Sequence, residues 1–271
     1  MSRVPALLTG LWRRLSIEHA DGRIDATTTV LWLQTRTLYA DIRIPTGRPS
    51  GAFADLTDEG LLRCAAQEGF AGTIALDGDV CTWHRALDVQ PPGAPPDAGR
   101  LTLQGSLLVE YGVHVPYTEH WWRQDDGGGR LAAFRLERDA AGLARTGVLV
   151  LVGDHFLEAV SRPFALPEAP SLAALVAPEL DAGRRDVAER LLDVSLCYGR
   201  IAARGTPWRV EHATLPWLEG RRLFERAPPS FDPDTGVLVR PSDDGREVWR
   251  LDDSTIPGAD LARLFTLEEP R

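Results

Sequence analysis

The 271-residue sequence contains no lysine, so all 30 of its basic residues are arginine. A Walker-type phosphate loop needs a lysine, and catalysis by pyridoxal phosphate or by an aldolase mechanism needs a lysine amine for the Schiff base. The sequence therefore excludes these chemistries. The single methionine and the abundance of alanine, glycine, proline and arginine are typical of a GC-rich genome and favour a bacterial origin.

Cysteine is scarce as well. Cys64, Cys81 and Cys197 are widely spaced and form no C-x-x-C pair, so neither a disulfide framework nor a zinc cluster is expected. No segment approaches the roughly 20 apolar residues of a membrane helix, and the apolar stretch near the amino terminus lacks a signal-peptide cleavage site. These absences predict a cytoplasmic protein with three buried, reduced thiols and no membrane partner.

Clustered positive charge and metal-binding motifs are also missing. The net charge is −9 and no basic run occurs, which argues against a nucleic-acid partner because phosphate binding needs grouped cations. The six histidines show none of the spacings typical of metal sites. No G-x-S-x-G nucleophile motif is present either. We therefore expect neither a metal nor a cofactor.

Short strand-like segments are what the sequence does contain. The segment 27–44 is rich in β-branched and aromatic residues and predicts a strand pair with a tight turn near Thr35 and Arg36. A short helix is predicted near 57–69, with Thr57 as its N-cap and acidic residues in its first turn. The strands that follow are separated by Gly-, Pro- and Asp-rich turns, which predicts an antiparallel meander rather than a βαβ fold.

The domain organisation follows from length and from one helical stretch. A chain of 271 residues is long enough for two domains. A helical stretch at about 171–194, interrupted by Pro178 and Gly183, separates two series of strands. We predict an amino-terminal β-barrel over 1–168 and a helical linker with a carboxy-terminal β-barrel over 169–271. The segment DDGGG at 125–129 predicts a hairpin loop within the first barrel.

Five segments resemble a known family: WLQTRTLY, YTEHWW, GVLVLVGDHFLEAVSRP, SLCYGRI and WRVEHATL, which include Glu119, Trp121, Tyr198 and Gly199. The chain is similar over most of its length to the small HRI-type family, named for a yeast protein that interacts with a casein-kinase homologue and uncharacterised in function. The resemblance implies two calycin-like, or lipocalin-like, antiparallel β-barrels in tandem and no established activity. The longer segment at 43–70 departs from the yeast pattern, so the yeast partner interaction is not carried over.

The densest polar and aromatic stretch is YTEHWWRQ at 117–124. Strand alternation places Tyr117, Glu119 and Trp121 on one face and His120 on the other. If the first face lines a barrel mouth, Glu119 is a candidate general acid or base and the rings are candidate walls for a flat ligand. The alternative is a structural strand in which the tryptophan fills the core and Glu119 pairs with Arg123 at the rim, because small barrels fill their interior with large side chains.

Two other strands carry candidate site residues. Tyr39, Asp41 and Arg43 share one face of LYADIRI, and Trp83 and Arg85 share one face of TWHR. An arginine held by an aspartate inside a pocket is a good clamp for a carboxylate, because the guanidinium group is a planar fork. An outward salt bridge would give the same alternation, since alternation does not say which face is interior.

These patterns support two functional hypotheses. The first is a cytoplasmic binding protein whose amino-terminal barrel holds a small, partly aromatic or acyl ligand through Tyr39, Asp41, Arg43, Trp83, Arg85 and Trp121. The second is a cofactor-free lyase, isomerase or hydrolase that acts on a small carboxylated or aromatic substrate through Glu119, with Tyr117 or His120 assisting. Both hypotheses place the pocket in the first half and predict a filled interior in the second.

A third possibility is a scaffold protein that forms a homodimer through its carboxy-terminal half. Large exposed apolar side chains mark protein interfaces. The expected signature of this surface is exposure of the rings of Trp208, Trp217 and Trp249.

Overall fold

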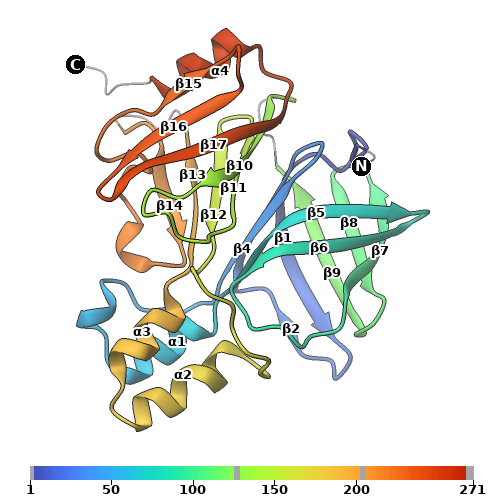
Figure 1. The fold of residues 1–271 in the computed structure, drawn as a ribbon. Helices are drawn as coiled ribbons and strands as arrows, with labels where there is room; N and C mark the ends of the chain where they lie inside the picture. Colours follow the sequence, from blue (N-terminus) through green and yellow to red (C-terminus); the bar gives the residue numbers. More distant parts are fainter. Residues whose placement is uncertain (1–2, 125–128, 202–205, 267–271) are drawn as a thin grey trace.

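The computed structural model describes residues 3–124, 129–201 and 206–266. Two antiparallel sheets form the framework of this part of the chain, and three of its four α-helices form a separate cluster beside them (Figure 1). The mainly β fold with a few short helices, predicted from the strand-like segments, is confirmed.

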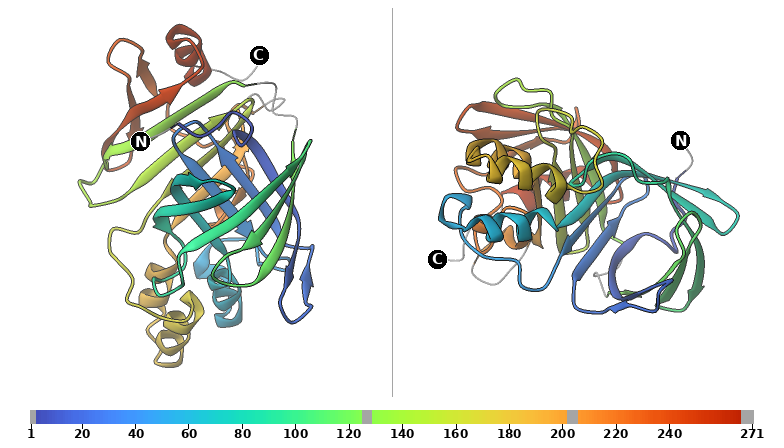
Figure 2. Two further views of the ribbon diagram at one scale, coloured as in Figure 1. Left: turned by 90° about the vertical axis from the view of Figure 1, so that its right-hand side faces the viewer. Right: turned by 90° about the horizontal axis from the view of Figure 1, so that it is seen from below.

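The first sheet closes on itself as a barrel. Its strand order is β2-β1-β3-β4-β5-β6-β7-β8-β9, and an additional antiparallel pairing of β1 with β9 completes the ring. Seen from below, these strands curve around a common axis (Figure 2). The strands are β1 (Gly10–His19), β2 (Ile24–Asp25), β3 (Thr29–Gln34), β4 (Tyr39–Ile44), β5 (Glu68–Asp77), β6 (Val80–Asp88), β7 (Asp97–Gln104), β8 (Leu107–Gly112) and β9 (Tyr117–Arg123).

Local predictions in the first barrel are confirmed. Strands β3 and β4 form the predicted pair, and the Thr35 hydroxyl group fastens their turn by donating to the carbonyl oxygen of Leu38 at 2.8 Å. Thr57 caps helix α1 (Asp58–Ala65), which a short 3-10 turn, η1 (Phe53–Asp55), precedes. The helix ends four residues earlier than 69 because the chain from Glu68 onward joins β5 of the barrel.

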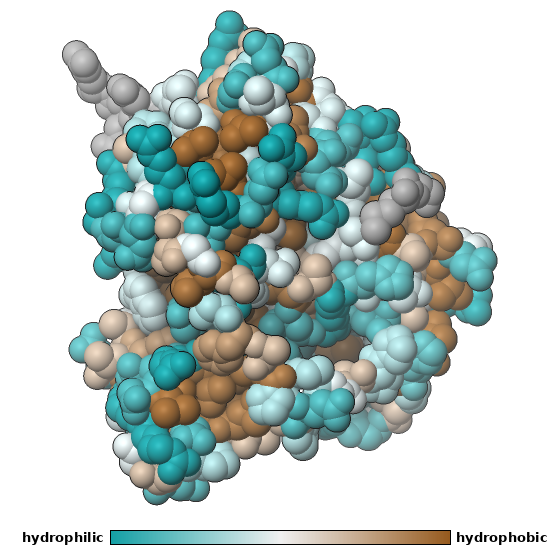
Figure 3. Space-filling model, viewed as in Figure 1, coloured by the Kyte–Doolittle hydropathy of each residue, from teal (hydrophilic) through white to brown (hydrophobic). Residues whose placement is uncertain are grey.

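Three of the four helices gather at one end of the molecule (Figure 1). The helical stretch predicted at 171–194 forms α2 (Leu172–Asp181) and α3 (Arg185–Leu192), and both pack against α1. Apolar side chains reach the surface over this cluster (Figure 3). Within the described residues, no helix combines the length and apolar character needed to cross a membrane.

The second sheet has the strand order β14-β13-β12-β11-β10-β17-β16-β15. A closed second barrel was expected, but no pairing joins β14 to β15 in the described part of the chain. Helix α4 packs against β15 at this end of the sheet. The elements are β10 (Leu131–Arg138), β11 (Gly147–Val152), β12 (His155–Val160), β13 (Ser195–Arg200), β14 (Arg209–Ala213), η2 (Pro216–Leu218), β15 (Ser230–Asp232), β16 (Val237–Ser242), β17 (Gly245–Ser254) and α4 (Gly258–Phe265).

The division between the two sheets differs from the predicted boundary at 168/169. Strands β10, β11 and β12 belong to the second sheet, because β10 pairs with β11 on one side and with β17 on the other. The first sheet ends at Arg123 and the second begins at Leu131. The segment 125–129 therefore connects two sheets and is not a hairpin loop; residues 125–128 themselves lie outside the described residues.

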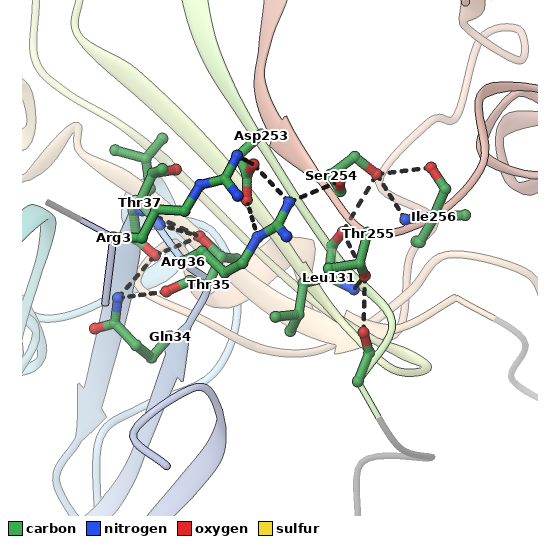
Figure 4. A network of polar contacts seen from close by, with 12 residues as sticks. Arg3, Gln34, Thr35, Arg36, Thr37, Leu131, Asp253, Ser254, Thr255 and Ile256 are labelled. Carbon is green, nitrogen blue, oxygen red and sulfur yellow. Dashed lines mark hydrogen bonds and ion pairs between the residues drawn. The ribbon is translucent and has the colours of Figure 1, made fainter. Parts of the chain in front are cut away.

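A shared apolar core joins the two sheets. It combines side chains from β3, β4 and α1 with side chains from β10 to β13, α2 and α3. A polar clamp adds to this interface (Figure 4): Arg36, in the β3–β4 turn, donates from Nε and Nη2 to the two carboxylate oxygens of Asp253 at 2.7 Å each. Such bidentate pairs fix orientation as well as adding energy. The two sheets therefore form one packed body.

The tryptophans of the second half do not form the expected exposed surface. Trp208 and Trp249 are 1% exposed and lie in the core of the second sheet with Phe134, Phe156 and Phe265. Trp217 is half-buried, and its ring contacts Phe53 at a centroid distance of 4.6 Å. The predicted exposure of these rings is wrong, because they fill space inside the fold.

Gly72 gives a direct test of the barrel geometry. It lies at a β-bulge between β5 and β6, where a Cβ atom would be 1.9 Å from the carbonyl oxygen of His84. We expect Gly72→Ala to lower the free energy of unfolding by about 3 kcal/mol, as overpacking does in closely packed cores. Urea denaturation measures the change, with Thr73→Ala on the same strand as the control. Equal stability of the two variants would contradict the bulge.

Candidate functional site

The interior of the first barrel collects most of the residues singled out from the sequence. Tyr39, Asp41, Trp83, Glu119 and Trp121 are buried. Arg43 and Tyr117 are half-buried beside them, and Arg85 lies with its guanidinium carbon 3.7 Å from the centre of the Phe70 ring. His120 is on the opposite strand face, where its Nδ1 lies 3.4 Å from Ser16 Oγ. Arg85 itself is exposed, and its carboxylate partners are Asp88 and Asp97. The structure therefore brings seven of the nine residues together in the interior and leaves Arg85 at the surface and His120 on the outer face.

Asp41 and Arg43 form a buried ion pair on β4. The Nε of Arg43 donates to Oδ1 of Asp41 at 2.8 Å, and Asp41 is 2% exposed. Burial raises the pKa of Asp41 to about 6, although the charge of Arg43 opposes the shift. A modest fall in pH therefore neutralises Asp41 and frees part of the hydrogen-bonding capacity of Arg43.

Arg14 is a site residue that the sequence analysis missed. Its Nη1 donates to Glu119 Oε1 at 2.7 Å and its Nη2 to Asp25 Oδ2 at 3.1 Å. Nη1 of Arg43 lies 3.7 Å from the same oxygen of Glu119, so two guanidinium groups neutralise this buried carboxylate. The alternation of Trp12 with Arg14 in GLWRRLSIEH could have indicated an inward arginine, had this segment been interpreted as a strand.

Glu110 is the second residue that was missed, and it has no arginine partner within 4.0 Å in the described residues. It accepts hydrogen bonds from the Tyr117 hydroxyl at 2.6 Å and from Trp121 Nε1 at 3.1 Å. It also faces Glu119 directly across the β8–β9 ladder. Burial, with the charge of Glu119 adding to it, holds the pKa of Glu110 well above its usual range. A carboxyl group whose burial favours the protonated form thus lies opposite an ion-paired carboxylate.

The other half of the barrel interior is packed with aromatic rings. The Trp32 ring has centroid distances of 6.0 Å to Trp12, 5.8 Å to Trp83 and 5.8 Å to Trp121. Between these rings and the acids remains a cleft of about 10 Å³, room for roughly one water molecule. The hydroxyl group of Tyr39 is buried and has no hydrogen-bond partner in the described residues.

A second space lies at the charged end of the barrel. A pocket of about 200 Å³ opens there, and Arg43 lines both this pocket and the inner cleft. The pocket lining includes Arg14, His19, Asp25, Thr28 and Glu68. Hydrogen bonds from Thr27 and Thr28 outweigh partial burial and hold the pKa of Asp25 below its usual range. Arg43 therefore lies between the two spaces.

The fold and this interior define a closed antiparallel β-barrel with an aromatic half and a charged half. The described residues contain no group of three or more His, Cys, Asp or Glu side chains arranged to hold a metal ion. The three cysteines are buried and unpaired, as predicted.

Of the comparisons with known proteins, the similarity to a yeast structure supports the fold and nothing further. No family model matches the sequence, and no curated protein matches it. An uncharacterized protein of Saccharomyces cerevisiae, YLR301w, has a similar structure with a TM-score of 0.57 and 12% sequence identity, covering 91% of this chain and 98% of the yeast chain. A lipocalin-like protein of Bacteroides uniformis has a TM-score of 0.28 and 12% identity, covering 43% of this chain and 98% of its own.

Proposed function

We propose that this protein is a binding protein that holds a small, partly aromatic or acyl ligand at the charged end of its amino-terminal barrel. The 200 Å³ pocket would take the polar group of the ligand between Arg14 and Arg43. The apolar part would enter the inner cleft, toward Trp83 and Trp121, when Arg43 moves aside. The ligand would therefore widen a space that is closed in its absence.

The observation that carries this proposal is the set of charged groups inside the barrel: Arg14, Asp41, Arg43, Glu110 and Glu119. Removing charges from water costs several kcal/mol per ion, and replacing a buried ion pair by apolar side chains is often neutral or stabilising. Strongly perturbed ionisable groups beside a pocket are typical of functional sites. The unpartnered hydroxyl group of Tyr39 adds a free hydrogen-bonding group to the same interior.

The catalytic alternative has one observation in its favour, which is the pairing of Glu110 with Glu119. Two neighbouring carboxyl groups in different protonation states are a common arrangement for acid and base. In this reading Glu110, rather than Glu119, would be the acid, and His120 on the outer face would take no part.

Arg43→Met is expected to weaken ligand binding about tenfold or more, because a hydrogen bond to a charged group contributes about 1.5–3 kcal/mol. Native mass spectrometry of the protein from its own host would identify a retained ligand. Titration with indole-3-acetate, followed by the fluorescence of the barrel tryptophans, would give the affinity.

The matched control is Arg240→Met in the second sheet. Arg240 is half-buried like Arg43, and its Nη1 donates to Glu158 Oε2 at 2.6 Å. We expect this variant to bind like the wild type. The proposal would fail if no ligand is retained and no probe changes the fluorescence, or if Arg240→Met weakens binding as much as Arg43→Met.

A further inference from the structure

A second pocket, of about 520 Å³, lies away from the barrel interior. Three stretches of chain form it: residues 86–92 at the end of β6, residues 144–146 before β11, and residues 161–166 after β12. It therefore lies where the first barrel meets the second sheet. Most of its lining is apolar and includes Leu87, Pro92, Pro163, Phe164 and Leu166.

Arg162 is the basic residue of this pocket, and it is 5% exposed. Its Nε donates to the backbone carbonyl oxygen of Leu191 at the end of α3. Its Nη2 is buried with no hydrogen-bond partner, and no carboxylate of the described residues lies within 4.0 Å. Arg14, Arg43 and Arg240, in contrast, all pair with carboxylates.

A buried cation without a counter-ion is costly. Burial lowers the pKa of Arg162 to about 10, although the negative charges of Asp193 and Asp88 oppose this shift. Unsatisfied buried polar groups in folded proteins are often explained by a missing water or ion. Arg162 is therefore a buried guanidinium group with one unused donor and no carboxylate partner among the described residues.

We propose that this pocket binds an organic monocarboxylate, with the carboxylate on Arg162 and an aliphatic or aryl body against Phe164, Leu87 and Pro92. A single arginine matches a single negative charge. Asp88 also lines the pocket, and Arg85 already binds its carboxylate at 2.7 Å. Because Asp88 is negatively charged, it disfavours a dianion such as phosphate in the pocket. The apolar lining requires a hydrophobic body on the ligand.

The site is independent of the barrel site, and a calorimetric titration with octanoate tests it. We expect the wild type to bind octanoate and to bind the neutral analogue 1-octanol at least tenfold more weakly. Arg162→Met should lose at least tenfold in octanoate affinity, while Arg43→Met keeps this binding. Arg100→Met, which removes an exposed arginine paired with Asp79, is the control for net charge.

Thermal unfolding separates ligand binding from a purely structural role of Arg162 at the end of α3. Octanoate should raise the melting temperature of the wild type and leave that of Arg162→Met unchanged. Phe164→Ala alters a side chain that is 38% exposed, so it should fold and still bind octanoate several-fold more weakly. Equal octanoate affinity in the wild type and both variants, or no binding by the wild type, would overturn the proposal.

Discussion

Arg14→Met is expected to lower the free energy of unfolding by about 3 kcal/mol, because it leaves the buried carboxylate of Glu119 without its nearest counter-ion. Asp25 would lose its contact with the same arginine. Arg43, 3.7 Å from Glu119, would compensate only in part. Urea denaturation at pH 7 measures the loss.

A double variant separates the charge effect from the loss of packing. The double variant Arg14→Met/Glu119→Gln removes both charges of the ion pair. It should be more stable than Arg14→Met alone, because no buried charge is left unpaired. Arg23→Met, which breaks an exposed pair with Asp21, should change stability by less than about 1 kcal/mol. A similar small loss for Arg14→Met would show that water reaches Glu119 freely.

Glu110→Gln is expected to stabilise the protein at pH 8 and to have little effect at pH 4. Burial raises the pKa of Glu110 in the folded state, so the fold favours the protonated acid. The resulting stability is fully present below the unfolded pKa of about 4.3 and is lost as pH rises through the folded pKa. Each unit of pKa difference contributes about 1.4 kcal/mol.

The neutral amide of glutamine can keep both hydrogen bonds of Glu110. Its oxygen can accept from Trp121, and its amino group can donate to the Tyr117 hydroxyl, which both donates and accepts. Denaturant titrations of both proteins from pH 4 to 8 measure the difference. Glu59→Gln on the exposed face of α1 is the control and should give a small, pH-independent change. If the difference in unfolding free energy between Glu110→Gln and the wild type stays constant from pH 4 to 8, the pKa of Glu110 is not raised.

Local pattern explains which parts of the site could be found from the sequence. Strand alternation correctly grouped Tyr39 with Asp41 and Arg43, and Tyr117 with Glu119, because side-chain direction in a strand repeats every two residues. Alternation could not show that the face of β4 with Tyr39 and the face of β9 with Tyr117 point into the same barrel. Arg14 and Glu110 were missed because their importance comes from partners on other strands.

The amino-acid sequence by itself determined the mainly antiparallel β class, the capped helix after Thr57, the three reduced cysteines and the alternation of faces, since these depend on neighbouring residues or on composition. Only the tertiary structure decided which sheet each strand joins, because pairing depends on burial and register over long separations. It assigned β10 to β12 to the second sheet. It also closed β1 onto β9, and so placed Arg14 beside Glu119, 105 residues away.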